Sequence, residues 1–161
     1  MPDVLLSYIG LKRGVKAAAR ASLIAAIGAA VGGVIMYVWS AEHFEQAYAA
    51  VRAVPAISDS MIEHALARMS ENWPLATFLG PLSSTPFKVY AILAPAAAGA
   101  PLPLFAIAAI AVRLPRFLIV SVGAALVGRV LSHLLSARVL LWVLIGAWLL
   151  FYAVFFAVMP N

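Results

Sequence analysis

The sequence has no cysteine and few charged residues, and both shortages exclude large classes of protein. Only 11% of its 161 residues are charged, whereas 65% are hydrophobic and the mean hydropathy is +1.04. An average soluble domain has about a quarter charged residues, so a water-soluble fold is not expected. Without cysteine, disulfides and thiolate metal sites are excluded. The length allows one membrane domain over residues 1–161 and no separate soluble domain.

Familiar catalytic motifs are also lacking. The chain contains no GxSxG motif, no P-loop and no HExxH motif, and its three histidines do not have the spacing of metal ligands. His64 beside Glu63 is only half of a metal motif, and Ser83 or Ser84 near Lys88 is the one conceivable pair of nucleophile and base. We therefore expect no enzymatic activity, no cofactor and no bound metal.

Three apolar stretches are long enough to cross a bilayer core of about 30 Å, and each is predicted to be a transmembrane helix. Residues 21–39 are rich in alanine and glycine, residues 103–131 are almost continuously apolar, and residues 139–158 carry no charge. In the first stretch, Gly28 and Gly32 form a small-xxx-small pattern. This pattern is compatible with packing against another helix of the same chain and with a contact between two chains.

Residues 40–72 contain five of the six acidic residues and are predicted to be amphipathic. A proline near the middle separates two helical pieces, and Ser58 is placed to cap the second. In that second piece Ile62, Leu66 and Met69 recur at helical spacing and predict an apolar face. We expect this segment to lie at the membrane surface or over the other helices.

Residues 73–99 are hydrophobic but are interrupted by four prolines, with Ser83, Ser84 and Thr85 near the middle. Two short apolar arms around a polar break are typical of a re-entrant hairpin, because irregular backbone at membrane depth must be covered by protein or line a cavity. A proline-kinked span with Lys88 reaching the interface is an equally open alternative.

Three basic side chains, Lys88, Arg113 and Arg116, lie within apolar sequence. An arginine at the centre of a membrane costs about 2.5 to 3.5 kcal/mol and needs a carboxylate, backbone carbonyls, water or a lipid headgroup beside it. Asp3 is the only acid outside residues 40–72. We expect Asp3 to pair with one of these bases, either as a structural partner or as the carrier of a coupling proton.

Further basic residues gather within residues 12–20 and 129–138, and the net charge is +5. Because these bases flank apolar stretches, anionic membrane lipids are expected as partners and nucleic acid is not. Residues 1–20 are predicted to form part of a hairpin or an interfacial helix, followed by a basic segment. The positive-inside bias places both basic clusters on one side and residues 40–72 on the other, which favours the re-entrant hairpin.

Three stretches in order resemble the DedA family, the bacterial branch of the VTT-domain (SNARE-associated Golgi) membrane proteins, and most closely its short YqaA-like members. Residues 2–6 resemble the end of the family's first re-entrant motif. Residues 85–92 (TPFKVYAI) resemble its TPxPYKVFTIAAG-like segment, and residues 112–117 (VRLPRF) its GRxxRF-like signature. The chain departs from the family at Pro95 and Val112, where glycines are usual, and it lacks the first arm of the first hairpin.

The resemblance implies two inverted hairpin-plus-helix repeats in a bacterial inner membrane and translocation of a lipid or lipid-phosphate headgroup, in some members with proton coupling. Together with the composition, it predicts an all-α integral membrane protein with a re-entrant hairpin, about three transmembrane helices and an amphipathic segment. The residues expected to serve transport are Asp3, Ser83, Ser84, Thr85, Pro86, Lys88, Arg113 and Arg116.

The alternative is a membrane assembly factor, or a subunit of a larger complex, that transports nothing. The missing hairpin arm and the glycine-rich first span favour it. Its partner would be a second copy of the chain or another membrane protein.

Overall fold

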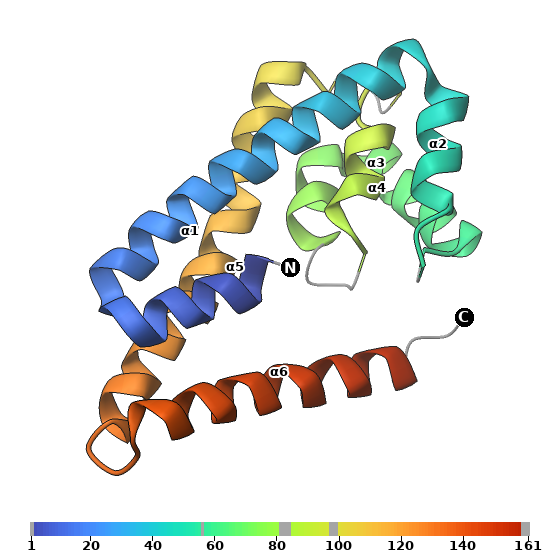
Figure 1. Cartoon of the computed structure of the whole chain (residues 1–161). Helices are drawn as coiled ribbons and strands as arrows, with labels where there is room; N and C mark the ends of the chain where they lie inside the picture. Colours follow the sequence, from blue (N-terminus) through green and yellow to red (C-terminus); the bar gives the residue numbers. More distant parts are fainter. Residues whose placement is uncertain (1, 56, 81–84, 97–99, 159–161) are drawn as a thin grey trace. The chain divides into compact units, whose positions relative to one another are not determined.

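The computed structural model describes residues 2–55, 57–80, 85–96 and 100–158, and all regular secondary structure in these ranges is helical. Contacts between Cα atoms divide the chain into two compact units. Unit 1 comprises residues 1–26 and 114–160, and unit 2 comprises residues 27–113. The helices, coloured along the chain in Figure 1, are α1 (Pro2–Glu42), α2 (Phe44–Arg52), α3 (Asp59–Leu79), α4 (Phe87–Leu93), α5 (Leu102–Leu131) and α6 (Ala137–Val158).

Three helices, α1, α5 and α6, are long and apolar enough to cross a membrane. They contain the predicted spans 21–39, 103–131 and 139–158, so the prediction of three such helices is confirmed. In their most apolar windows only 22%, 22% and 6% of the residues are buried. Helices that expose apolar side chains on most sides are expected to face lipid rather than water.

Helix α1 consists of two arms joined at Gly14, and Figure 1 shows the chain turning sharply there. Gly14 has φ 76° and ψ −175°, a backbone conformation that is essentially restricted to glycine. The predicted basic segment is therefore divided. Lys12 and Arg13 end the first arm, whereas Lys16 and Arg20 begin the long second arm, which is one continuous helix with the predicted span.

In unit 1, small residues let the N-terminal arm of α1 approach α5 closely. A Cβ atom added to Gly10 would overlap the backbone carbonyl oxygen of Ser121, and one added to Gly128 would overlap the side chain of Leu11. Ser22 and Ser121 are fully buried, with their Oγ atoms 2.8 Å apart in a hydrogen bond. Close approach through small residues and isolated polar contacts is typical of helices that pack within a membrane.

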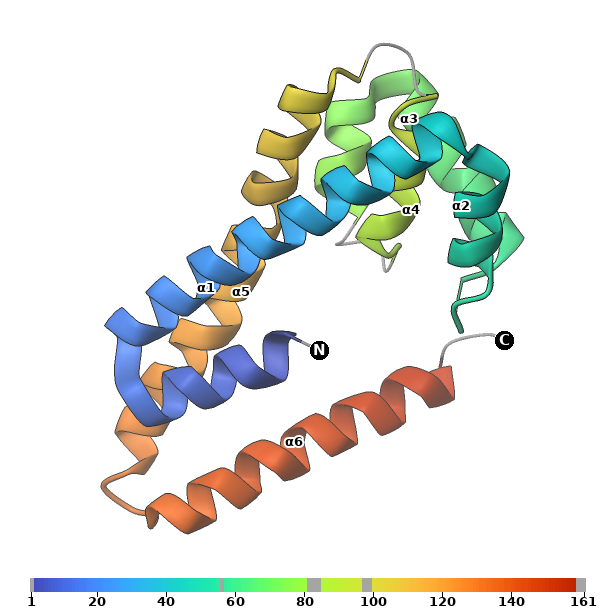
Figure 2. The same cartoon turned by 45° about the horizontal axis from the view of Figure 1, so that its top comes forward.

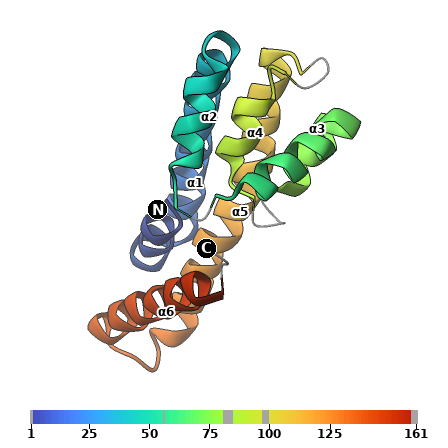
Figure 3. The ribbon, with the colours of Figure 1, turned by 90° about the vertical axis from the view of Figure 1, so that its right-hand side faces the viewer.

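Unit 2 is organised around α4, of which every residue except Lys88 is buried. Helix α4 contacts both α2 and α3 and lies between them in Figure 3. The largest fully buried side chains of this unit are Tyr90, Phe105 and Met69. Because large apolar side chains fill its interior, unit 2 has a conventional packed core.

The region predicted as a hairpin is a pair of short helices. Helix α3 is interrupted at Asn72 (φ −157°, ψ 87°), just before Pro74, and its last turns run antiparallel to α4 in Figures 1 and 2. The ring of Tyr90 occupies the space where Gly80 has no side chain. The end of α3 and the whole of α4 lie within the predicted region, and Ser83 and Ser84 between them lie outside the described residues.

The amphipathic segment forms α2 and the first part of α3. Ser58 caps α3 as predicted, because its Oγ accepts a hydrogen bond from the Met61 backbone N–H at 3.3 Å. The buried face carries Ile62, Ala65 and Met69, whereas Leu66 is 45% exposed. At 3.6 residues per turn, residues 65 and 66 flank the line that joins residues 62 and 69, and in this structure only residue 65 packs inside unit 2.

Candidate functional site

The residues expected to serve transport fall into two groups, one in each unit. Asp3 and Arg116 belong to unit 1. Thr85, Pro86, Lys88 and Arg113 belong to unit 2, while Ser83 and Ser84 lie outside the described residues. Arg113 and Arg116 are one turn apart on α5; Arg113 contacts Phe87 of unit 2, and Arg116 pairs with Asp3 of unit 1.

In unit 1, Asp3 forms an ion pair with Arg116. The Nη2 atom of Arg116 donates a hydrogen bond to Oδ2 of Asp3 at 2.9 Å. The two partners differ greatly in exposure, because the Asp3 side chain is 7% exposed and the Arg116 side chain 56%. The acid is thus fixed inside the packing of unit 1, and the guanidinium group is accessible from outside.

The second carboxylate oxygen of Asp3 is also buried. Among the described residues, this Oδ1 atom has no hydrogen-bond partner. Asp3 lies in the first turn of α1, where the partial positive charge of the helix N-terminus favours an ionised carboxylate. Loss of Arg116 would leave the buried Asp3 carboxylate without a compensating charge, and removing one partner of a buried pair is strongly destabilising.

Helix α6 contributes two aromatic side chains to the surroundings of Asp3. Nε1–H of Trp148 donates a hydrogen bond to Oγ of Ser7 at 2.9 Å, and that hydroxyl donates to the carbonyl oxygen of Val4. Tyr152, stacked on Trp148, lies within the electrostatic field of both Asp3 and Arg116. The uncharged last span therefore takes part in the polar contacts of unit 1.

In unit 2, Arg113 lies over an aromatic ring. Its guanidinium carbon is 4.6 Å from the centroid of the Phe87 ring, a cation–π contact. Phe87 is held in turn by stacking on Phe105, with ring centroids 5.6 Å apart, and by the close approach of Gly33. The first residue of α4 thereby fixes the position of a base on α5.

Lys88 is the one residue of α4 that is partly exposed, and it follows Thr85 and Pro86, which are also partly exposed. The backbone N–H of Thr85 donates to the carbonyl oxygen of Gly80, and Pro86 has the extended backbone of an N-cap. Partial burial lowers the pKa of the Lys88 ammonium group. Thr85 and Pro86 thus position the start of α4 and, with it, Lys88.

Five residues of the polar contacts in unit 1 were not predicted: Ser7, Ser22, Ser121, Trp148 and Tyr152. A serine or an aromatic residue within an apolar span carries no local signal that distinguishes a buried hydrogen bond from an exposed position. Only the interruption of the apolar pattern at Ser22 and Ser121 could have drawn attention to them.

Within the described residues, no group of three or more histidines and carboxylates is placed to hold a metal ion. A comparison of the chain with family models, curated proteins and solved structures finds no match.

Proposed function

We propose that this chain is an integral membrane protein that translocates a lipid or a lipid-phosphate headgroup, as its resemblance to the DedA family implies. In this proposal α1, α5 and α6 span a bacterial inner membrane. The antiparallel pair formed by the end of α3 and by α4 enters the membrane as a re-entrant hairpin. The three long apolar helices support the first part, and the short paired helices on either side of the Gly80 break support the second.

The observation that carries the proposal is the ion pair between buried Asp3 and half-exposed Arg116. A guanidinium group binds phosphate oxygens through paired N–H donors, in the same geometry as a carboxylate. Because Arg116 is accessible and Asp3 is not, an incoming phosphate reaches the base without displacing the acid from its place. The headgroup then competes with Asp3 for Arg116.

This competition links headgroup binding to a proton. When Arg116 turns to a phosphate, Asp3 becomes a buried carboxylate without a cation, and its Oδ1 atom already has no hydrogen-bond donor among the described residues. In this proposal Asp3 then takes up the coupling proton that the resemblance implies for some members of the family. Release of the headgroup restores the ion pair and expels the proton.

Lys88 and Arg113 of unit 2 form the second group of bases in this proposal. The contact of Arg113 with Phe87 holds its guanidinium group on the face of an aromatic ring. In this proposal the positive charges of Lys88 and Arg113 attract the phosphate of the headgroup.

The test is reconstitution of the purified chain into liposomes that contain a fluorescent phospholipid, with the rate of headgroup movement between leaflets as the measurement. Replacing Arg116 by alanine removes a charge-assisted hydrogen bond worth about 1.5 to 3 kcal/mol and should slow movement about 10-fold or more. Asp3→Asn should remove any coupling of lipid movement to a pH gradient across the membrane, because the proposed carrier of the proton is then absent.

The matched control is Arg52→Ala, which removes another ion-paired arginine. Arg52 pairs with Asp59 on the exposed amphipathic segment, with 2.7 Å between the charged atoms. This variant should flip lipid at the rate of the unmodified protein. Unchanged rates in Arg116→Ala, Arg113→Ala and Lys88→Ala, with correctly inserted protein, would contradict the proposal.

One observation favours the alternative, a membrane assembly factor or subunit. The positions where Gly28 and Gly32 would carry side chains are open, with nothing within 4 Å. This small-xxx-small pattern is therefore not used for packing within the described part of unit 2, and it offers a surface for another helix. The alternative predicts that a stoichiometric partner co-purifies from native membranes and is lost in Gly28→Leu, without any lipid movement by the chain alone.

A further inference from the structure

Helix α6 has a single face that is not exposed. The buried and partly buried residues of this helix recur at helical spacing, and they are Leu140, Leu141, Leu144, Trp148, Tyr152 and Phe155. Trp148 and Tyr152 are one turn apart on this face, and their rings stack with centroids 5.6 Å apart. The last span is therefore attached to unit 1 along one line of side chains that includes both rings.

The N-terminal arm of α1 carries Asp3 and Ser7 on one face in the same way. Both residues are buried, and they are one turn apart. Trp148 donates its hydrogen bond to Ser7, and the arm runs in the opposite direction to α6 in Figures 1 and 2. In such an antiparallel pair, the residue one turn before Ser7 lies opposite the residue one turn after Trp148. This register places Tyr152 beside Asp3, and Tyr152 lies within the electrostatic field of that acid.

The buried carboxylate of Asp3 has room for a second hydrogen-bond donor. Its Oδ1 atom is buried and has no hydrogen-bond partner among the described residues. Ser7 donates its one hydroxyl proton to the carbonyl oxygen of Val4, and Trp148 donates its one N–H to Ser7. The phenol hydroxyl of Tyr152 is a donor, and a hydrogen bond to a carboxylate is stronger than one to a neutral acceptor. On this face of α6, Tyr152 is thus the side chain suited to hold the acid.

We propose that Tyr152 is a positioning residue for the pair of Asp3 and Arg116. Its hydroxyl donates to the Asp3 carboxylate when Arg116 turns to a phosphate, so that the acid stays in place until the base returns. This role rests on the translocation proposed above, and it gives the last span a part in that process. Trp148 fixes the phenol ring beside the acid, through its stacking on Tyr152 and its hydrogen bond to Ser7.

The test measures the equilibrium constant of unfolding of the full-length protein in detergent, for Tyr152→Phe in two backgrounds. Arg116→Ala stands for the state in which the base has left the acid. In that background Tyr152→Phe should raise the constant about 10-fold or more, because it removes a hydrogen bond to an unpaired carboxylate. With Arg116 present, the same change should raise the constant by about 3-fold at most. Packing of the ring alone predicts no such difference, since phenylalanine keeps the ring in both backgrounds.

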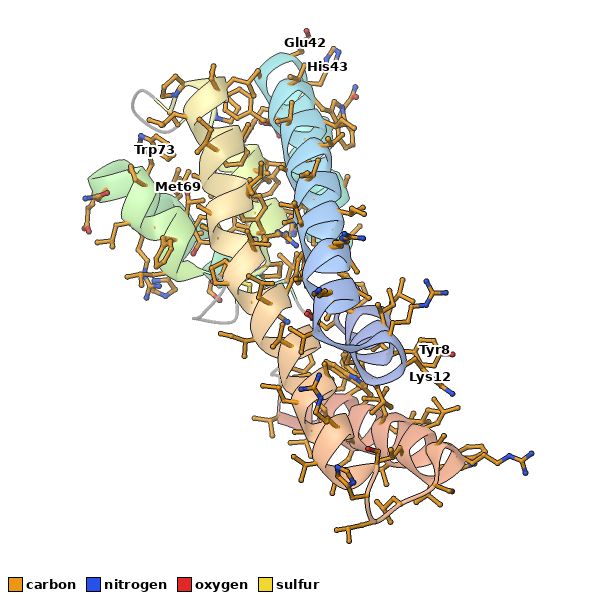
Figure 4. The ribbon with its side chains drawn as sticks, turned by 90° about the vertical axis from the view of Figure 1, so that its left-hand side faces the viewer. Tyr8, Lys12, Glu42, His43, Met69 and Trp73 are labelled. Atoms are coloured by element: carbon orange, nitrogen blue, oxygen red, sulfur yellow. The ribbon has the colours of Figure 1, made fainter. Side chains whose placement is uncertain are left out.

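The matched control is Tyr8→Phe, which makes the same chemical change on the N-terminal arm. The Tyr8 side chain is 40% exposed and projects outward in Figure 4, so this variant should leave the constant unaltered in both backgrounds. A further background, Asp3→Ala, removes the acceptor, and Tyr152→Phe should then have no effect. This comparison decides the question without Arg116→Ala if that variant does not fold.

The proposed role is overturned by equal effects of Tyr152→Phe with and without Arg116, or by an effect that persists undiminished in Asp3→Ala. In liposomes Tyr152→Phe should slow headgroup movement about 10-fold, whereas Tyr8→Phe should not slow it. If lipid movement requires Arg116 but the effects in the two backgrounds are equal, only the role of Tyr152 is wrong. If the effects differ as expected but no lipid moves, the hydrogen bond to Asp3 is supported and the translocation is wrong.

Discussion

The two units differ both in charge and in the way they are packed. Unit 1 has seven basic residues and one acid, whereas unit 2 has four basic and five acidic residues. Helices in unit 1 meet through Gly10, Gly128 and the serine pair, while unit 2 encloses Tyr90 and Phe105 in an aromatic and aliphatic core. One short chain therefore uses two different modes of helix packing.

The two modes stabilise helix contacts in different ways. In unit 1, close backbone approach and single hydrogen bonds hold the helices, as is typical of packing in lipid. In unit 2, α2 and α3 contact the central helix α4, and large apolar side chains fill the interior. Large-to-small substitutions should therefore lower the stability of unit 2 most, whereas small-to-large substitutions should matter most in unit 1.

The largest expected effect is in the core of unit 2. Phe105→Ala should lower the free energy of unfolding by about 3 to 5 kcal/mol, because Phe105 is fully buried against the rings of Phe87 and Tyr37. The measurement is the thermal unfolding midpoint in detergent. Leu149→Ala, at a 67% exposed position of α6, serves as the control and should change the free energy by less than about 0.5 kcal/mol. Equal losses would remove the distinction between core and lipid-facing surface.

An intermediate effect is expected at the buried ion pair of unit 1. Arg116→Ala should cost about 1.5 to 3 kcal/mol at neutral pH, since it leaves the Asp3 carboxylate buried without its cation. Unfolding midpoints of the variant and the unmodified protein in detergent would show this loss. Asp3→Asn/Arg116→Ala should recover part of it, because no carboxylate is then left buried without its cation. A double variant that is as unstable as Arg116→Ala would contradict the assignment.

The smallest effect is expected where unit 1 depends on close approach. Gly10→Ala should cost about 1 kcal/mol or more, because the added Cβ atom overlaps the Ser121 carbonyl oxygen on α5. Gly28→Ala makes the same chemical change in α1, but its Cβ atom meets open space. It should be neutral or stabilise the helix by up to about 1 kcal/mol. Comparing the two unfolding midpoints isolates the contact with α5 from helix propensity, and equal shifts would show that this contact contributes nothing.

Much of the helical framework was predictable because its signals are local. Apolar runs of spanning length located α1, α5 and α6, and a serine before a helical pattern located the start of α3. Helical spacing placed Ile62, Leu66 and Met69 on one face, but it could not show that Ala65 is buried while Leu66 is exposed, because that depends on which side packs inside unit 2. The long helix through Ala21 extends back to the Gly14 turn because nothing between them interrupts the helical backbone.

The contacts between the candidate functional residues could not be predicted from local sequence patterns. Composition was sufficient to indicate that Asp3 needs a base, since an acid in apolar surroundings is costly without one. It could not select Arg116 from the other bases, and it gave no reason to connect Trp148 with Ser7 or Leu11 with Gly128. Helices arise from the free energies of neighbouring residues, whereas these contacts depend on the shapes and directions of distant side chains, which exist only once the helices have packed.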